Sequence, residues 1–141
     1  MSKREIKHLD GVRLSDQGDS VIIIDQSLLP NETVFLELKE AADMYEAIHQ
    51  LRVRGAPAIG IFAGYALYCL ARQSSADDFP AFMDELNSQA AYLNSSRPTA
   101  VNLSWALKRM IAKAEAAGSK SKEEVLEDLR EESLAIHNED I

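Results

Sequence analysis

Two arginines in the 141-residue sequence stand directly before segments suited to open a helix. Arg54 precedes Gly55, Ala56 and a proline, and Arg97 directly precedes a second proline. Proline suits the first position of a helix, because no backbone donor is lost there. The first turn of a helix presents unpaired N–H groups and positive potential, so anions bind there readily. Arginine adds a planar fork of donors that fits phosphate, and the small Gly55 and Ala56 let a ligand approach the backbone. These residue types predict phosphate binding.

Both loops also have a simpler interpretation. An arginine before a helix is often only a surface residue, and helix starts are common. Because two such loops occur in one small domain, an anion site and a plain surface position have comparable weight. Asp25 and Gln26 end a run of Val and Ile, where they either form a turn in which Asp25 caps its own backbone or border the same site. Arg52 is expected to face solvent or an interface.

No other residues form a recognisable catalytic or metal-binding set. His8, His49 and His137 are scattered without metal-ligand spacing, and His49 is expected to be solvated on the polar side of its helix. Cys69 lies in an apolar segment and is predicted to be a small core residue rather than a nucleophile. Trp105 and the methionines stand at core spacing. The sequence has no glycine-rich nucleotide loop, no paired-cysteine motif and no Ser-His-Asp arrangement, so it predicts no metal and no organic cofactor.

The composition fits one globular domain that is 46% hydrophobic and 27% charged. Lys and Arg number 15 and Asp and Glu 23, which gives a net charge of −8 and argues against a nucleic-acid surface. No apolar run is long enough to span a bilayer, and the start of the chain lacks the apolar core of a signal peptide. A single cysteine cannot form an internal disulfide. We therefore expect a cytoplasmic protein with neither nucleic acid nor membrane as a partner.

The two arginine loops must be carried by helices and strands, and the spacing of apolar residues changes after residue 38 from a strand period to a helix period. Residues 1–38 predict a small antiparallel β-subdomain, with turns at 10–11 and 17–19, a β-branched strand at 21–24 and an alternating strand at 33–38. Residues 39–141 predict a bundle of about five helices, so the fold class is α+β. The first expected helix covers residues 41–51. The second and fourth begin at the prolines 57 and 98, and the third begins after the acidic pair 77–78. The fifth begins at the capping box of Ser121 and Glu124.

The second and last of these helices have distinct surfaces. The helix from residue 57 is small and apolar on nearly every side and is expected at the centre of the bundle, whereas the acid-rich segment 121–141 is expected to expose a solvated face. Gly118 is the expected stop of the fourth helix.

Three segments carry a resemblance to a known family. They are residues 24–30 (Ile-Asp-Gln-Ser-Leu-Leu-Pro), 53–60 (Val-Arg-Gly-Ala-Pro-Ala-Ile-Gly) and 96–103 (Ser-Arg-Pro-Thr-Ala-Val-Asn-Leu). In type, order and spacing they resemble the motifs of methylthioribose-1-phosphate isomerases, and the resemblance spans nearly the whole chain. That family is related to ribose-1,5-bisphosphate isomerases and to the regulatory subunits of translation initiation factor 2B, which match the motifs less fully.

The resemblance implies a two-part protein in which a Rossmann-like second domain, absent from this chain, follows the β-subdomain and helical bundle. The substrate site lies between the parts, and Arg54, Gly55, Ala56 and Arg97 take the place of the residues that hold the substrate phosphate. The catalytic cysteine and aspartate of the family lie in second-domain motifs that this chain lacks, and Cys69 is in the wrong context to replace them.

The implied activity is the conversion of 5-methylthioribose-1-phosphate to 5-methylthioribulose-1-phosphate in methionine salvage, a route of methionine and amino-acid biosynthesis. The full-length protein is expected to be a homodimer, and this chain alone is expected to be inactive and to expose an apolar patch where the second domain docks. The alternatives are an isomerase of the ribose-1,5-bisphosphate type and a non-catalytic regulatory subunit of the initiation factor 2B type.

Overall fold

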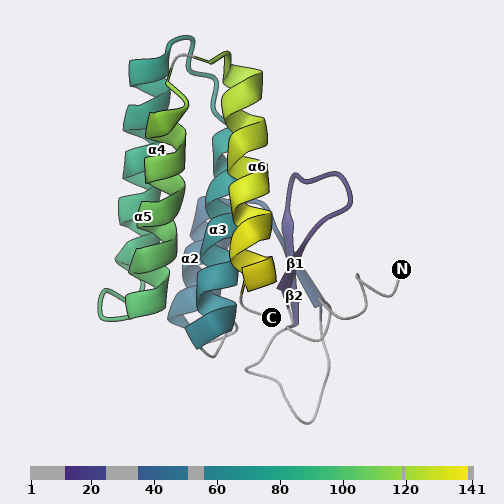
Figure 1. Cartoon of the computed structure of the whole chain (residues 1–141). Coiled ribbons are helices and arrows are strands. Elements are labelled where there is room, and N and C mark those ends of the chain that lie inside the picture. The colour runs from purple at the N-terminus through teal and green to yellow at the C-terminus, as the bar shows by residue number, and fades with distance from the viewer. Residues whose placement is uncertain (1–11, 25–34, 51–55, 119, 140–141) are drawn as a thin grey trace.

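A computed structural model of the chain describes residues 12–24, 35–50, 56–118 and 120–139. These residues form a three-stranded antiparallel sheet and five helices (Figure 1). The elements are β1 (Val12–Leu14), β2 (Val21–Ile24), β3 (Phe35–Leu38), α2 (Ala41–His49), α3 (Ala56–Arg72), α4 (Phe79–Asn94), α5 (Val101–Ala116) and α6 (Lys122–Glu139). The predicted α+β class is confirmed.

The sheet has the order β1-β2-β3 and packs against α3, on the side of the bundle away from α4 and α5 (Figure 1). Its first hairpin turns at Gly18, whose φ of 75° lies in the left-handed region that favours glycine. Ser15 closes this turn, because its N–H donates to the Ser20 carbonyl at 2.9 Å and its own carbonyl accepts from the Gly18 N–H at 2.9 Å. The predicted turn at 17–19 is thus confirmed, whereas the one at 10–11 lies outside the described residues.

Helix α3 is the centre of the bundle and packs against the four other helices and against β1 and β2. Every residue from Ile59 to Ala71 is buried, which confirms the prediction of an apolar central helix. Its small residues let neighbouring helices approach: a Cβ atom on Gly60 would lie 3.5 Å from the Asn102 carbonyl oxygen of α5. The second turn of α3 therefore lies next to the first turn of α5.

Local capping sets the starts of two helices as the sequence predicts. The Asp78 side chain accepts a hydrogen bond from the Ala81 N–H at 2.8 Å and caps α4. At the start of α6 the Ser121 N–H donates to the Glu124 carboxylate at 3.1 Å, and the Glu124 N–H donates to Ser121 Oγ at 3.2 Å. This reciprocal pair is the predicted capping box.

The predicted start of α5 at Pro98 is wrong by three residues. The Ala100 N–H donates to the Arg97 carbonyl at 2.9 Å and closes a turn that contains Pro98. Ala100 then has extended backbone angles, φ −80° and ψ 105°, so the helix begins only at Val101. Gly118 follows the end of α5 as predicted, but without a positive φ; it leaves room for the ring of Phe79, which a Cβ atom would approach to 3.1 Å.

The expectation that Trp105 is a core residue is also wrong. The inward face of α5 is filled by Leu103, Ala106, Leu107, Met110 and Ala114. Trp105 lies off that stripe with 49% of its surface exposed, and Val101, one turn earlier, is 77% exposed. The Trp105 ring is covered in part by the Arg109 guanidinium, 5.4 Å from its centroid, and Arg109 in turn pairs with Glu132 and Glu139 of α6. Hydrophobic spacing alone cannot separate two apolar stripes on one helix.

Among the described helices, none combines the length and the apolar character that crossing a membrane requires. The last helix, α6, exposes most of its acidic side chains, as its charge predicts.

Candidate functional site

The predicted phosphate-binding residues are only partly within the described structure. Arg54 and Gly55 lie outside the described residues, as do Arg52, Asp25 and Gln26. Ala56 is the first residue of α3, and Arg97 lies half-buried in the loop that joins α4 to α5. The site must therefore be built from Arg97 and from the elements that flank residues 51–55.

Described residues on both sides of the 51–55 segment lie near the Arg97 loop or the helix that follows it. On one side α2 ends at His49, whose Nδ1 lies 3.2 Å from the carbonyl oxygen of Ser96. On the other side α3 begins at Ala56, and its first turns approach the start of α5 at Gly60 and Asn102. The end of α2 and the first turns of α3, which flank residues 51–55, thus lie near the Arg97 loop and the start of α5.

The backbone of the Arg97 loop is held by a series of local hydrogen bonds. The Ser96 N–H donates to the Leu93 carbonyl at 3.1 Å, and the Arg97 N–H donates to the Asn94 carbonyl at 3.3 Å. Ser96 is 5% exposed, and its hydroxyl also donates to the Leu93 carbonyl, at 2.6 Å. Together with the turn closed by Ala100, these bonds fix the point from which the Arg97 side chain leaves the backbone.

Arg97 has no carboxylate partner among the described residues, although the chain carries a net charge of −8. Other arginines of the described structure do pair: Arg13 with Asp16, Arg109 with Glu132 and Glu139, and Arg130 with Glu127. A half-buried guanidinium without a counter-ion is a favourable place for an added anion, because part of its solvation has been removed.

The two helix starts beside Arg97 are also free of acids. The first turns of α3 and α5 contain no Asp or Glu, whereas α2 has Asp43 and α6 has Glu123 and Glu124 in the equivalent turns. Ala100, which precedes α5, provides no side-chain cap for its N–H groups. The positive potential and the unpaired N–H groups of α5 are therefore available to an external anion.

The sequence missed the part that His49 plays in this arrangement. Its ring is exposed as predicted, but it also contacts Ser96 and stacks on Tyr45 with ring centroids 5.8 Å apart. Tyr45 stacks in turn on Tyr92 of α4 at 4.8 Å. The spacing of Tyr45 and His49, one turn apart on α2, was the available signal, but the partner on α4 was not visible from the sequence.

The remaining chemically active side chains are structural. Cys69 is fully buried, and burial raises the pKa of its thiol to about 12, so the thiolate is rare near neutral pH; the predicted core role is confirmed. His137 is also fully buried, with Nδ1 2.6 Å from the Tyr65 hydroxyl, which joins α6 to α3. Its burial was not foreseen. Within the described ranges, His, Cys, Asp and Glu side chains nowhere gather in a group that could hold a metal ion.

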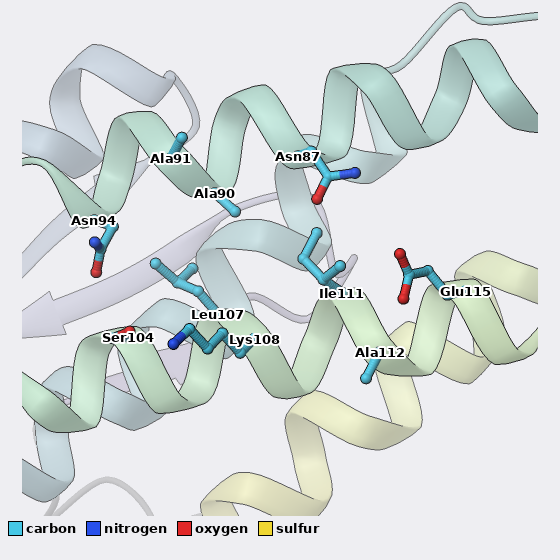
Figure 2. A pocket seen from close by; sticks show the side chains of 10 residues that line it. All are labelled: Asn87, Ala90, Ala91, Asn94, Ser104, Leu107, Lys108, Ile111, Ala112 and Glu115. Atoms are coloured by element: carbon cyan, nitrogen blue, oxygen red, sulfur yellow. The ribbon is translucent and has the colours of Figure 1, made fainter.

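A separate groove of about 310 Å³ runs between α4 and α5 (Figure 2). Asn94 lies at one end of it and Glu115 at the other, with Ala90, Leu107 and Ile111 between them. Arg97 does not line it, and its polar groups do not converge on one point. The groove is therefore not the predicted phosphate site.

Comparison with known proteins places this geometry among sugar-phosphate isomerases and their relatives. Residues 52–141 match a family described as the initiation factor 2 subunit family. The chain is 47% identical over 130 residues to a 5-deoxyribose 1-phosphate isomerase of Clostridium botulinum, covering 92% of this chain and 37% of the relative. It is 48% identical over 134 residues to a methylthioribose-1-phosphate isomerase of Symbiobacterium thermophilum, covering 95% of this chain and 37% of the relative.

Two solved structures share the fold. The crystal structure of 5-methylthioribose 1-phosphate isomerase from Pyrococcus horikoshii superposes with a TM-score of 0.86 at 35% identity, over 92% of this chain and 36% of that one. The delta subunit of translation initiation factor eIF-2B from A. fulgidus superposes with a TM-score of 0.83 at 31% identity, over the same shares. The chain thus spans little more than a third of the length of the proteins it matches.

Proposed function

Because this chain belongs to the initiation factor 2 subunit family, we propose that it forms the substrate-phosphate-binding domain of a sugar-phosphate isomerase. The observation that carries the proposal is Arg97, which pairs with no carboxylate of the described residues, beside the acid-free start of α5 and near the second turn of α3. Arg54 and Gly55 stand two residues and one residue before Ala56, the first residue of α3. A chain advances at most about 3.3–3.6 Å per residue, so Arg54 cannot be far from that helix start. Arg54, Gly55, Ala56 and Arg97 together would hold one phosphate.

The proposed reaction is the aldose–ketose isomerisation of 5-methylthioribose-1-phosphate in methionine salvage. Phosphate esterifies the anomeric oxygen of this sugar, so ring opening needs an acid, and hydrogen must then move from C2 to C1. The phosphate stays on C1 throughout. The domain's part is to hold that phosphate in place, since orientation can lower the barrier to the chemical step. The acid and the hydrogen-transfer groups would come from the second domain.

A second candidate substrate is 5-deoxyribose 1-phosphate, the sugar named for the Clostridium relatives. The two sugars share a pentose with phosphate on C1 and differ at C5, away from the phosphate. Contacts made by this domain to the phosphate would serve both. A regulatory, non-catalytic role is the other candidate, favoured by the likeness to the initiation factor subunit.

Val101 and Trp105 supply an exposed apolar surface one helical turn apart on α5. Arg109, one turn further on, bonds Glu139, the last residue of α6. The surface therefore lies near the point at which the chain leaves α6. We include in the proposal that a second domain packs there and that the complete protein is a homodimer.

The 141-residue chain is expected to bind a pentose 1-phosphate without isomerising it, because the catalytic motifs that the resemblance assigns to a second domain do not occur in its sequence. Titration of methylthioribose-1-phosphate into the ¹⁵N-labelled chain should shift amide signals at residues 54–60 and 97–103. The same sample, assayed for the ketose product, should give no turnover above a protein-free blank. Turnover above that blank, or amide shifts confined to other regions, would contradict the proposal.

A further inference from the structure

We propose that His49 is a positioning residue, which holds the Arg97 loop in the place where Arg97 can bind the substrate phosphate. The inference rests on the proposed function and adds a residue outside both arginine motifs. His49 is the last residue of α2, and the 51–55 segment begins two residues after it. Its side chain ties the end of α2 to the backbone of the Arg97 loop.

The contact acts on the peptide unit from which Arg97 departs. His49 Nδ1 lies 3.2 Å from the Ser96 carbonyl oxygen. A carbonyl can only accept, so Nδ1 carries the proton and donates. The same peptide unit supplies the Arg97 N–H, which donates to the Asn94 carbonyl at 3.3 Å. Both sides of this peptide plane are thus held, one by α4 and one by α2.

A stack of rings limits the movement of His49. Its ring lies on Tyr45 at an interplanar angle of 28°, and Tyr45 lies on Tyr92 at the same angle. Tyr92 is also tied to the loop, because the Ser95 hydroxyl donates to its carbonyl at 2.6 Å. The end of α2, the end of α4 and the loop before Arg97 are therefore joined by direct contacts.

Placement matters here because arginine binds phosphate through a planar fork, which tolerates little displacement. If the loop shifts, the charge of Arg97 remains but its geometry toward the phosphate is lost. The predicted effect of losing the His49 bond is thus smaller than that of losing Arg97, and it should require Arg97.

Two substitutions separate the hydrogen bond from the stack. His49→Phe keeps a ring for Tyr45 but cannot donate, whereas His49→Asn keeps a donor near the position of Nδ1 and loses the ring. Affinity for inorganic phosphate is measured by NMR titration of the 141-residue chain. We expect His49→Phe to weaken binding about 3- to 10-fold, the usual range for one neutral hydrogen bond, and His49→Asn to recover most of that loss.

A double-mutant cycle with Arg97→Ala tests whether His49 acts through the arginine. His49→Phe should have no further effect on affinity in the Arg97→Ala background, and amide hydrogen exchange at Arg97 and Ala100 should be faster in His49→Phe than in the wild type. Equal losses in both backgrounds, or unchanged exchange at these amides, would overturn the positioning role while leaving the phosphate site intact. If Arg97→Ala alone leaves phosphate affinity unchanged, the proposed function itself is wrong and the inference falls with it.

Discussion

Replacing Arg97 by alanine is expected to weaken the binding of a pentose 1-phosphate about 10- to 150-fold and to leave the unfolding temperature nearly unchanged. A hydrogen bond to a charged group contributes about 1.5–3 kcal/mol, and 1.4 kcal/mol is a factor of ten in affinity. Little stability should be lost, because Arg97 pairs with no carboxylate of the described structure. In the complete protein, assayed for the proposed isomerisation, the loss should appear in KM rather than kcat, since the phosphate would keep nearly the same charge throughout the reaction.

The matched control is Arg130→Ala, which removes the same charge from an exposed position on α6, where Arg130 pairs with Glu127. It should change affinity little. Arg97→Lys should recover only part of the binding, because an ammonium cannot reproduce the guanidinium fork. Titration calorimetry and steady-state kinetics, each with a thermal melt, provide the comparison. A folded Arg97→Ala protein with normal KM and a collapsed kcat would mean that Arg97 acts in the transition state instead.

Phe62→Ala is expected to lower the free energy of unfolding by about 3–5 kcal/mol, the usual cost of removing a buried aromatic side chain. Phe62 is fully buried in α3, which packs against every other described helix. Single domains are stable by only about 5–15 kcal/mol, so this change removes a large part of the total. Because α3 begins at Ala56, directly after the Arg54 loop, we expect phosphate binding to weaken as well.

Urea denaturation followed by circular dichroism measures the effect of Phe62→Ala. Trp105→Ala is the control, because it removes a larger side chain that is half in solvent, and it should shift the midpoint clearly less. Equal shifts for the two variants would show that α3 is not the centre on which the bundle depends.

The sequence predicts most of the fold because the signals involved are local. The change of period after residue 38, the turn at Gly18 and the reciprocal bonds of Ser121 and Glu124 depend on residues a few positions apart. The start of α5 was misplaced because the turn closed by Ala100 competes with the helix preference of Pro98.

Features that depend on distant neighbours could not be predicted in the same way. Trp105 has core spacing, yet a second stripe of α5 fills the core and leaves it outside. His137 looks like a surface residue of an acidic helix until Tyr65, 72 positions away, comes within 2.6 Å of it. The site shows the same division: Arg97 is recognisable from its motif, whereas the contact of His49 with Ser96 exists only after α2 and α4 have packed.

The central claim is that Arg54 and Arg97 bind one phosphate at the adjoining starts of α3 and α5. It is tested most directly by a crystal structure of the protein with a bound pentose 1-phosphate. We predict both guanidinium groups within hydrogen-bond distance, about 2.7–3.2 Å, of oxygens on the same phosphate. A well-ordered phosphate held by only one of the two arginines, or a sugar phosphate bound instead in the groove between α4 and α5, would contradict the account.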